Sequence, residues 1–159
     1  MTSLYYENIK VLPSELPSKY NENELNDIIL EKLKNKIGNK CNKYGYIKKD
    51  SIIIINKSTP KIISQHFDGS LYYKLEYNAN IINPIINNEL KCKIQKINKM
   101  GILANNDCMY IVIPYELDNN INNIQLDIND DILIKIIGTN FEIYDTEIKI
   151  LGEFIKKIN

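Results

Sequence analysis

The sequence predicts an α+β domain, in which one helix covers an antiparallel sheet, followed by an all-β domain closed as a small barrel. Three observations lead to this fold class. An apolar stripe at helical spacing occurs in the first half, residues 71–79 alternate apolar and polar side chains, and short strands separated by turns follow from Leu90 onward. Because Pro84 lies between the two patterns, we expect domains of residues 1–82 and 83–159.

Composition limits the class of protein. The chain has 159 residues, 44% of them hydrophobic, which is enough for a buried core. Lys plus Arg and Asp plus Glu are 20 each, so binding to nucleic acid or a membrane would need a local patch. The three cysteines are scattered, and the N-terminus lacks a signal-peptide pattern. We therefore expect a soluble intracellular protein in a reducing compartment, with no membrane partner.

The first half begins with a predicted strand at residues 5–11, which stops before Pro13. Residues 21–37 form the clearest predicted helix. Asn21 is its expected N-cap and Gly38 its expected left-handed stop. Its apolar stripe consists of Leu25, Ile28, Ile29, Leu33 and Ile37.

The helix is followed by several short segments. We expect residues 39–47 to form a tight basic and aromatic loop, and the apolar run 52–55 to form a strand buried on both faces. Residues 61–67 are expected to form a short strand or loop edge, joined by an Asp68-Gly69 hairpin turn to the next strand. That next strand would bury Leu71, Tyr73, Leu75, Tyr77 and Ala79 on one face.

The second half contains no helical period. Predicted strands follow one another at close spacing, and without a long helix to cover them they are most simply closed as a barrel. A partial sandwich is the alternative. The predicted strands are residues 90–97, 102–104, 108–113, 132–137 and 147–151, with 141–144 as a further candidate.

Catalytic signatures are missing from the sequence. His66 is the single histidine and lies beside the predicted Asp68-Gly69 turn, where a structural role is expected. The cysteines do not have zinc-site spacing, and the glycines are isolated rather than clustered in a phosphate-binding loop. We therefore expect no catalysis, metal or cofactor.

Binding is the remaining possibility. Alternation places Lys91 and Lys93 on one face of the first barrel strand, and Lys96 and Lys99 follow on or just past it. Barrels that bind single-stranded nucleic acid combine such cations with aromatic side chains, for which Tyr110 and Tyr115 are candidates. A solvated strand face without a ligand explains the lysines equally well, and Tyr110 could be part of the core.

Two longer strings resemble a known family. The string IGNKCNKYGYI is similar to a Gly-x-Cys-x-x-x-(aromatic)-Gly-Tyr-Ile segment, and DGSLYYKLEYNANIINPIINNEL to a Gly-Ser turn, a strand of pattern aromatic-x-aliphatic-x-Tyr-x-Ala and a Pro junction. Glu89, Gly101 and the late string ILGEF also fall at matching places. In this order they resemble the larger stalk subunit of multisubunit RNA polymerases, the seventh subunit of RNA polymerase II and its archaeal counterpart.

The resemblance implies a fold and a function. The α+β domain would be an N-terminal stalk domain that docks on the polymerase, and the barrel an OB fold facing nascent single-stranded RNA. Expected partners are the core clamp region, a small common subunit and a helical stalk partner. The implied docking residues are Lys40, Cys41, Lys43, Tyr44, Gly45, Tyr46, Pro60, His66 and Asp68, and the implied RNA-binding residues are Lys91, Lys93, Lys99 and Tyr110.

The chain also departs from the family pattern. Where the family usually has Gly-Glu before the barrel, this chain has Asn88-Glu89. Where the family often has an aromatic residue after the turn glycine, this chain has Ile102. Compactness and an Ile/Asn bias resemble the stalk subunits of large DNA viruses. The resemblance implies that the protein is located inside the cell, where transcription takes place. For a viral protein this is a cytoplasmic virus factory or the virion, and for a cellular protein it is the nucleus. A free-standing OB-fold RNA-binding accessory protein is the alternative function.

Overall fold

The computed structural model describes residues 3–19, 21–62, 69–117 and 125–158. The chain divides into two compact units. The first unit consists of Met1–Gly38 and Ile47–Ile81, and the barrel unit consists of Asn39–Tyr46 and Ile82–Asn159. Among the described residues, no helix is both long and apolar enough to cross a membrane.

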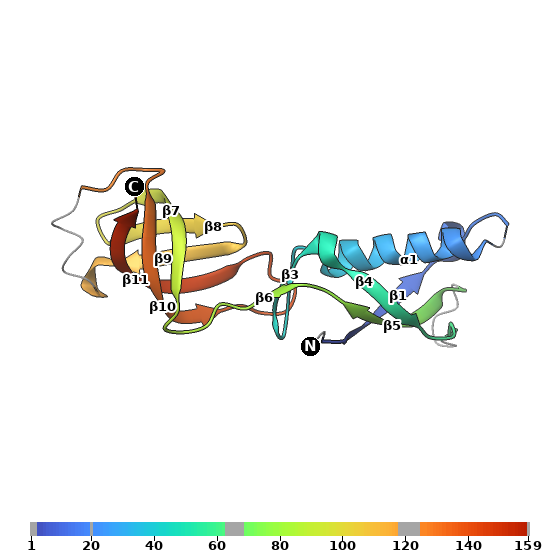
Figure 1. Cartoon of the computed structure of the whole chain (residues 1–159). Helices are drawn as coiled ribbons and strands as arrows, with labels where there is room; N and C mark the ends of the chain where they lie inside the picture. The colour runs from blue at the N-terminus through green and yellow to red at the C-terminus, as the bar shows by residue number, and fades with distance from the viewer. Residues whose placement is uncertain (1–2, 20, 63–68, 118–124, 159) are drawn as a thin grey trace. The chain divides into compact units, whose positions relative to one another are not determined.

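The first unit is a helix packed on an antiparallel sheet (Figure 1). The strand order is β1 (Tyr5–Val11), β5 (Leu71–Asn78) and β4 (Ile53–Lys57), with β5 paired on both sides. The predicted alternation of β5 is confirmed, because Tyr73, Leu75 and Tyr77 are buried. Together with Leu25, Ile29, Leu33 and Ile37 of the helix stripe they form the core of this unit, whereas Ile28 is only half-buried.

Helix α1 (Glu22–Ile37) matches the predicted helix. The Asn21 side chain accepts hydrogen bonds from the backbone amides of Asn23 (3.0 Å) and Glu24 (3.5 Å), which confirms the predicted N-cap. The predicted stop is wrong in detail: Gly38 has φ −65°, and Asn39 is the left-handed residue with φ 55°. Gly38 has a steric role instead, because a Cβ there would collide with the Lys34 carbonyl oxygen.

The prediction of a strand buried on both faces at residues 52–55 is wrong. Ile52 is buried, but Ile53 and Ile55 on β4 are 61% and 48% exposed. The reason is topological, because β4 is the last strand in the sheet order and has a β5 neighbour on one side. A continuous apolar run cannot distinguish a central strand from such an edge strand.

Several short elements connect these parts. One-turn 3₁₀ helices occupy Pro13–Glu15 and Lys49–Ser51, and a small sheet has the order β2 (Cys41–Asn42), β3 (Gly45–Ile47) and β6 (Ile81–Ile82). The loop predicted at residues 39–47 is therefore wrong, because the segment is a β-hairpin. Of the strand predicted at 61–67, the described Lys61 bridges Tyr72, and residues 63–68 lie outside the described part.

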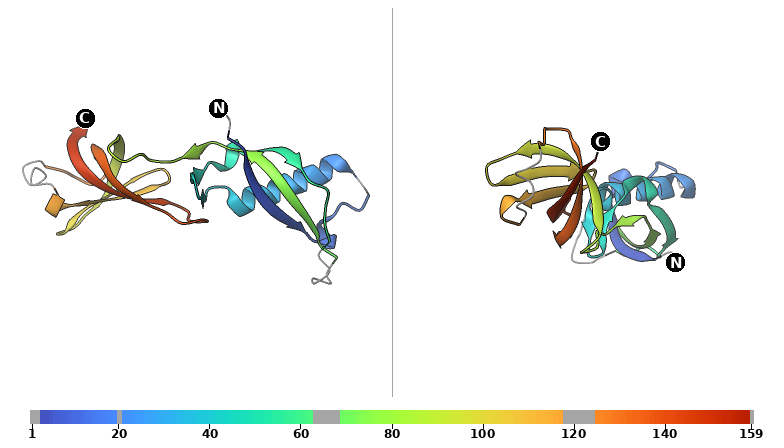
Figure 2. Two further views of the ribbon diagram at one scale, coloured as in Figure 1. Left: turned by 90° about the horizontal axis from the view of Figure 1, so that it is seen from below. Right: turned by 60° about the vertical axis from the view of Figure 1, so that its left-hand side comes forward.

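The barrel unit contains a closed β-barrel, built from five strands of the described residues (Figure 2). Strand β7 pairs with both β8 and β10, β11 lies between β10 and β9, and the β9–β11 pair is parallel. Closure confirms the predicted barrel and excludes the sandwich. The strands are β7 (Glu89–Ile97), β8 (Gly101–Asn106), β9 (Met109–Pro114), β10 (Asp131–Asn140) and β11 (Ile148–Ile158).

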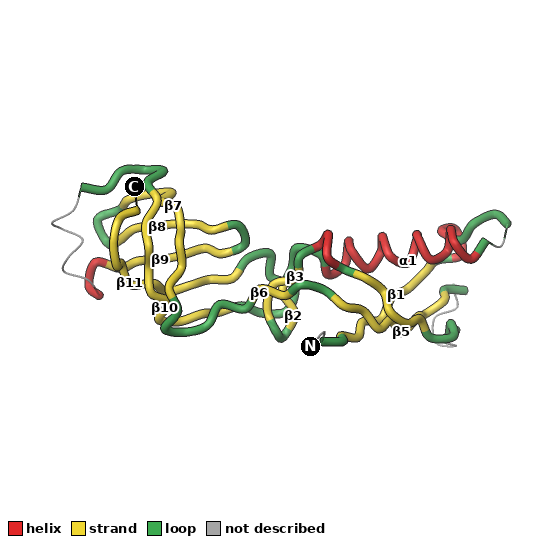
Figure 3. The backbone as a smooth tube through the Cα atoms, viewed as in Figure 1, coloured by secondary structure: helices red, strands yellow, loops and turns green. Residues whose placement is uncertain are grey.

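Isoleucine side chains fill the barrel, with Ile94, Ile111, Ile132, Ile134 and Ile148 completely buried. The candidate strand at residues 141–144 is wrong, because this segment is a turn between β10 and β11 (Figure 3). Strand β11 is longer than predicted, since its pairing with β10 continues to Ile158 past two irregularities in register.

Candidate nucleic-acid interface

A row of polar side chains crosses the outside of the barrel. Cross-strand pairing aligns Lys93 on β7 with Asn105 on β8, Asn105 with Tyr110 on β9, and Tyr110 with Lys149 on β11. Most neighbours of these residues along the strands are buried, so alternation turns the row outward; the buried neighbours are Cys92, Ile94, Ala104, Ile111, Ile148 and Ile150. Lys93, Asn105 and Lys149 are exposed and Tyr110 is half-buried. The row thus combines ammonium, amide and aromatic groups on one surface.

A second row beside the first is mainly apolar. Lys96 is paired with Leu103, Leu103 with Val112, and Val112 with Leu151. Two shallow hollows meet at Val112. One of about 450 Å³ also involves Met100, Pro114 and Tyr115, and one of about 340 Å³ also involves Gly138, Asn140, Lys149 and Leu151. Apolar hollows beside lysines can accept the faces of bases while the cations meet phosphates.

Acidic residues offset the lysines on β7. Asp131 on β10 is the register partner of Lys93, and Asp107 and Asp131 line the same hollow as Lys91 and Lys93. Among the described residues, none that lines the hollow beside Lys149 is acidic. The surface around Tyr110 and Lys149 is therefore better suited to a phosphate than the surface around Lys91 and Lys93.

The other residues predicted to meet RNA lie close to this surface. Lys99 is exposed in the β7–β8 turn and lines the larger hollow together with Tyr115 and Glu116. The Tyr115 amide donates to the Met100 carbonyl at 3.1 Å, and its side chain packs on the barrel core. Tyr115 is therefore held in place as part of the wall of the hollow.

The hairpin β2–β3 is attached to the β10–β11 connection. The Cys41 amide donates to the Asp145 carbonyl and the Tyr144 amide donates to the Cys41 carbonyl, both at 2.7 Å. At the tip, the Asn42 side chain accepts from the amides of Tyr44 and Gly45. Gly45 has φ 145°, which favours glycine. These bonds explain why the hairpin belongs to the barrel unit.

Side chains at the hairpin tip face solvent, whereas Cys41 is buried. Lys43 lies over the ring of Tyr44 at 4.9 Å from its centroid, and Tyr44 is 49% exposed. Burial, with Asp145 and Cys108 nearby, raises the pKa of the Cys41 thiol to about 11. Burial also raises the pKa of Cys92 to about 12, so both thiols are neutral at physiological pH.

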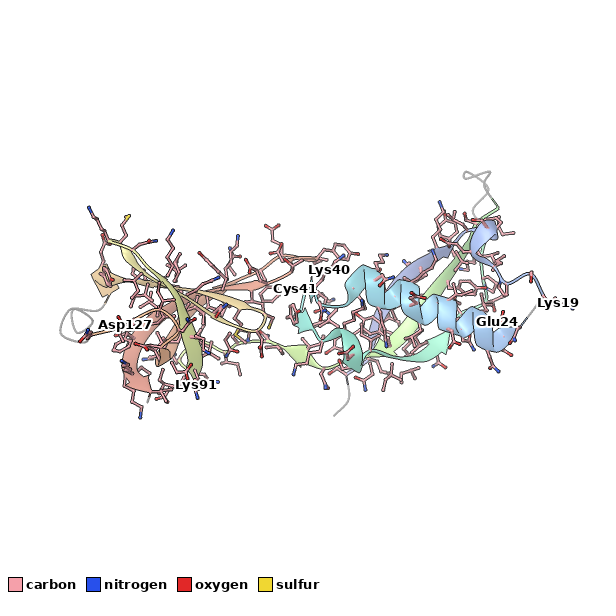
Figure 4. The ribbon with its side chains drawn as sticks, turned by 90° about the horizontal axis from the view of Figure 1, so that it is seen from above. Lys19, Glu24, Lys40, Cys41, Lys91 and Asp127 are labelled. Carbon is pink, nitrogen blue, oxygen red and sulfur yellow. The ribbon has the colours of Figure 1, made fainter. Side chains whose placement is uncertain are left out.

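The structure distributes the predicted docking residues over different places. Residues 40–46, which the sequence-based division assigned to the first domain, belong to the barrel unit. Pro60 is exposed in the first unit, and His66 and Asp68 lie outside the described residues. Figure 4 shows Lys40 and Cys41 at the hairpin and Lys91 on the barrel.

The hairpin and the predicted RNA-binding lysines are not brought together. Lys91 pairs with Leu133 on β10, and the hairpin is bonded to the turn that begins after Asn140. Asn140 lies seven positions after Leu133 on β10, about 23 Å along an extended strand. Lys91 is thus apart from the hairpin, whereas Tyr110 lies nearer to it, because its register partner Lys149 also pairs with Asn140.

Sequence reasoning missed Asn105 and Lys149 as members of the polar row. Both fall within or beside predicted strands, and alternation could have turned them outward. Their proximity to Tyr110 depends on the parallel β9–β11 register, which no local pattern encodes. Within the described ranges, no three His, Cys, Asp or Glu side chains are grouped to hold a metal ion.

Comparison with known proteins gives one informative similarity. No family model matches the chain. A protein of Acanthamoeba polyphaga mimivirus, named "Putative DNA-directed RNA polymerase subunit", is 29% identical in an alignment of 119 residues that covers 71% of this chain. The chain spans 56% of the length of that viral protein. The chain is therefore similar to a viral protein whose name describes it as a subunit of a transcribing enzyme.

Proposed function

We propose that this chain is a non-catalytic subunit of a DNA-directed RNA polymerase, the larger subunit of its stalk. The first unit docks on the core enzyme, and the barrel guides nascent RNA or initiation factors. The observation that carries the proposal is the similarity to the mimivirus protein over 119 residues. Since the chain spans 56% of that protein, its membership of the same kind of complex is itself part of the proposal.

The topology of the barrel supports an RNA-facing role. Strand β7 closes the barrel by pairing with β8 and β10, and β9 and β11 run parallel. This is the arrangement of an OB fold, which binds oligonucleotides over its second and third strands. Here those strands are β8 and β9, which carry Asn105, Tyr110 and the apolar pair Leu103 and Val112.

One end of the first unit is suited to docking. Gly69 lies against Pro13, since a Cβ at Gly69 would be 3.3 Å from the Pro13 ring. Two loops therefore meet there, and the one that carries Pro60 also exposes Ile62, which is 69% accessible. The Ile62 side chain is thus available for an apolar contact with a partner protein. We assign the docking role to this end, with the hairpin tip at Lys43 and Tyr44 as a second contact.

Co-purification tests the polymerase assignment. A tagged full-length chain, isolated from cells that make it with its natural partners, should recover the large catalytic polymerase subunits. The variant Ile62→Asp should recover less of them, because it puts a charge into the proposed contact. Ile128→Asp is the matched control, since Ile128 is 59% exposed on the barrel unit. Recovery of no polymerase subunit by the unmodified chain would reject the assignment.

The polar row favours a second candidate, a free-standing single-stranded RNA-binding protein. The isolated chain would then bind a labelled oligouridine at low salt, and affinity would fall as salt rises. Replacing Tyr110 and Lys149 by Ala should weaken binding by more than about fivefold, because stacking on one aromatic contributes about 1–3 kcal/mol. Lys135→Ala is the control, since Lys135 pairs with Glu89. A flat titration excludes this candidate and leaves the polymerase assignment standing.

A further inference from the structure

The sheet of the first unit ends at an open strand. Strand β4 is last in the order β1, β5, β4, and its antiparallel partner β5 lies on one side. No strand of the described residues pairs with the other side. Backbone amides and carbonyls along such an edge can pair with another extended chain.

A hollow of about 560 Å³ runs along this edge, between β4 and helix α1. The strand side is formed by consecutive residues, Ile52 to Lys57. Because successive residues of a strand point to opposite faces, a hollow that touches all of them must follow the backbone edge rather than one face. The helix side is formed by Glu22, Asn26, Asp27, Ile29 and Leu30.

The side chains at this edge are unusually apolar. Ile53 and Ile55 line the hollow and are 61% and 48% exposed. Edge strands are usually protected by charges, prolines or bulges. The register of β4 does shift between Ile54 and Asn56, which limits regular pairing to a short stretch.

The two sides of the hollow differ in charge. Glu22 and Asp27 lie on the helix side, and Lys57 lies on the strand side. Lys57 is already engaged, because its ammonium donates to Asn26 Oδ1 at 2.9 Å and lies 5.6 Å from the centre of the Tyr73 ring. The two carboxylates therefore leave an acidic rim over an apolar edge.

We propose that β4 receives a short extended segment of a partner polypeptide, which adds one strand to the sheet. Backbone hydrogen bonds to β4 supply the pairing, and alternate apolar side chains of the segment cover Ile53 and Ile55. Lysine or arginine residues at one end of the segment face Glu22 and Asp27. A nucleic acid fits poorly, because the acidic rim repels phosphate. The strand addition is independent of the polymerase assignment, since it rests on the first unit alone.

A synthetic peptide tests this directly with the full-length chain. The probe has about eight residues, a usual strand length, of alternating valine and threonine and ends in two lysines. It should shift the backbone amide signals of residues 53–57 in an NMR titration and slow their hydrogen exchange. The variant Ile53→Lys with Ile55→Lys should weaken binding at least about tenfold. Both positions are exposed, so folding is preserved, and Ile128→Lys is the matched control.

Two further peptides distinguish strand addition from non-specific apolar binding. A version that is N-methylated at alternate residues keeps its apolar surface but cannot form the backbone bonds, and it should not bind. A version ending in two glutamates should bind more weakly because of Glu22 and Asp27. Equal binding of the methylated peptide would overturn the proposal. So would dimerisation of the chain through β4 that the peptide cannot displace, since the occupant would then be a second copy.

Discussion

The barrel and the sheet of the first unit use the same side chains differently. In the barrel every strand is paired on both sides, so isoleucines such as Ile132 and Ile134 are enclosed completely. The sheet of the first unit stays open, and Ile53 and Ile55 at its edge remain exposed. Strand pairing, rather than residue type, therefore decides where an isoleucine is buried.

The difference also determines what each unit can recognise. Every strand of the closed barrel has a neighbour on both sides, so the barrel meets a ligand mainly with outward side chains, here the row from Lys93 to Lys149. The open sheet can offer backbone groups along β4 as well. We therefore expect the barrel to select a ligand by charge and stacking, and the first unit to select a partner by strand pairing.

The largest expected loss of stability comes from a cavity in either hydrophobic core. Ile134→Ala in the barrel and Leu33→Ala in helix α1 each remove a fully buried aliphatic group, at a cost of about 2–5 kcal/mol. The two residues belong to separate hydrophobic clusters. Hydrogen exchange should show that Ile134→Ala lowers protection mainly in β7 to β11, and Leu33→Ala mainly in β1, β4, β5 and α1.

Ile128→Ala serves as the control, because this exposed side chain should change neither pattern. If either core variant lowered protection equally along the whole chain, the two units would unfold as one. The contrast between a closed and an open unit would then have no consequence for stability.

The fold was predictable where a local period encodes it. Helix α1 and strand β5 each bury one stripe, so the spacing of Leu25, Ile29 and Leu33 or of Tyr73, Leu75 and Tyr77 was sufficient. The exposure of β4 was not predictable, because four consecutive isoleucines look the same at an edge and at a centre. The order of strands depends on distant pairings that neighbouring residues do not encode.

The candidate site was predictable only in part. Alternation correctly gave the outward direction of Lys91 and Lys93, which are exposed. It could not reveal that Asp131 is the cross-strand partner of Lys93, or that Lys149 is the partner of Tyr110. The membership of residues 40–46 in the barrel unit depends on backbone bonds to Tyr144 and Asp145, far away in sequence. Hydrogen bonds of this kind leave no periodic signal.

An intermediate effect is expected at Gly101, the first residue of β8. A Cβ at Gly101 would lie 2.5 Å from the Ile113 carbonyl oxygen and 3.0 Å from the Pro114 Cα. Both atoms are backbone of the paired strand β9 and cannot rotate away. Gly101→Ala should therefore cost about 1–3 kcal/mol in a denaturant titration.

Gly138→Ala in the same barrel is the matched control. There the added Cβ would meet only the Leu151 Cβ, at an ordinary 3.8 Å. Alanine also reduces the freedom of the unfolded chain, so this variant should be neutral or slightly stabilising. Equal losses from both substitutions would mean that glycine flexibility, and not the close approach of β8 to β9, is what the barrel requires.

The smallest of these effects should come from the helix that covers the open sheet. Asn21→Ala removes an acceptor for the amides of Asn23 and Glu24, and should cost about 1 kcal/mol. Helix α1 belongs to the first unit, so the loss should appear as faster amide exchange in α1 and in the sheet of that unit only. Asn23→Ala is the control, since Asn23 is exposed inside the first turn and alanine is the better helix former. An equal loss from Asn23→Ala would show that the first turn needs polar side chains in general, because the cap alone distinguishes the two positions.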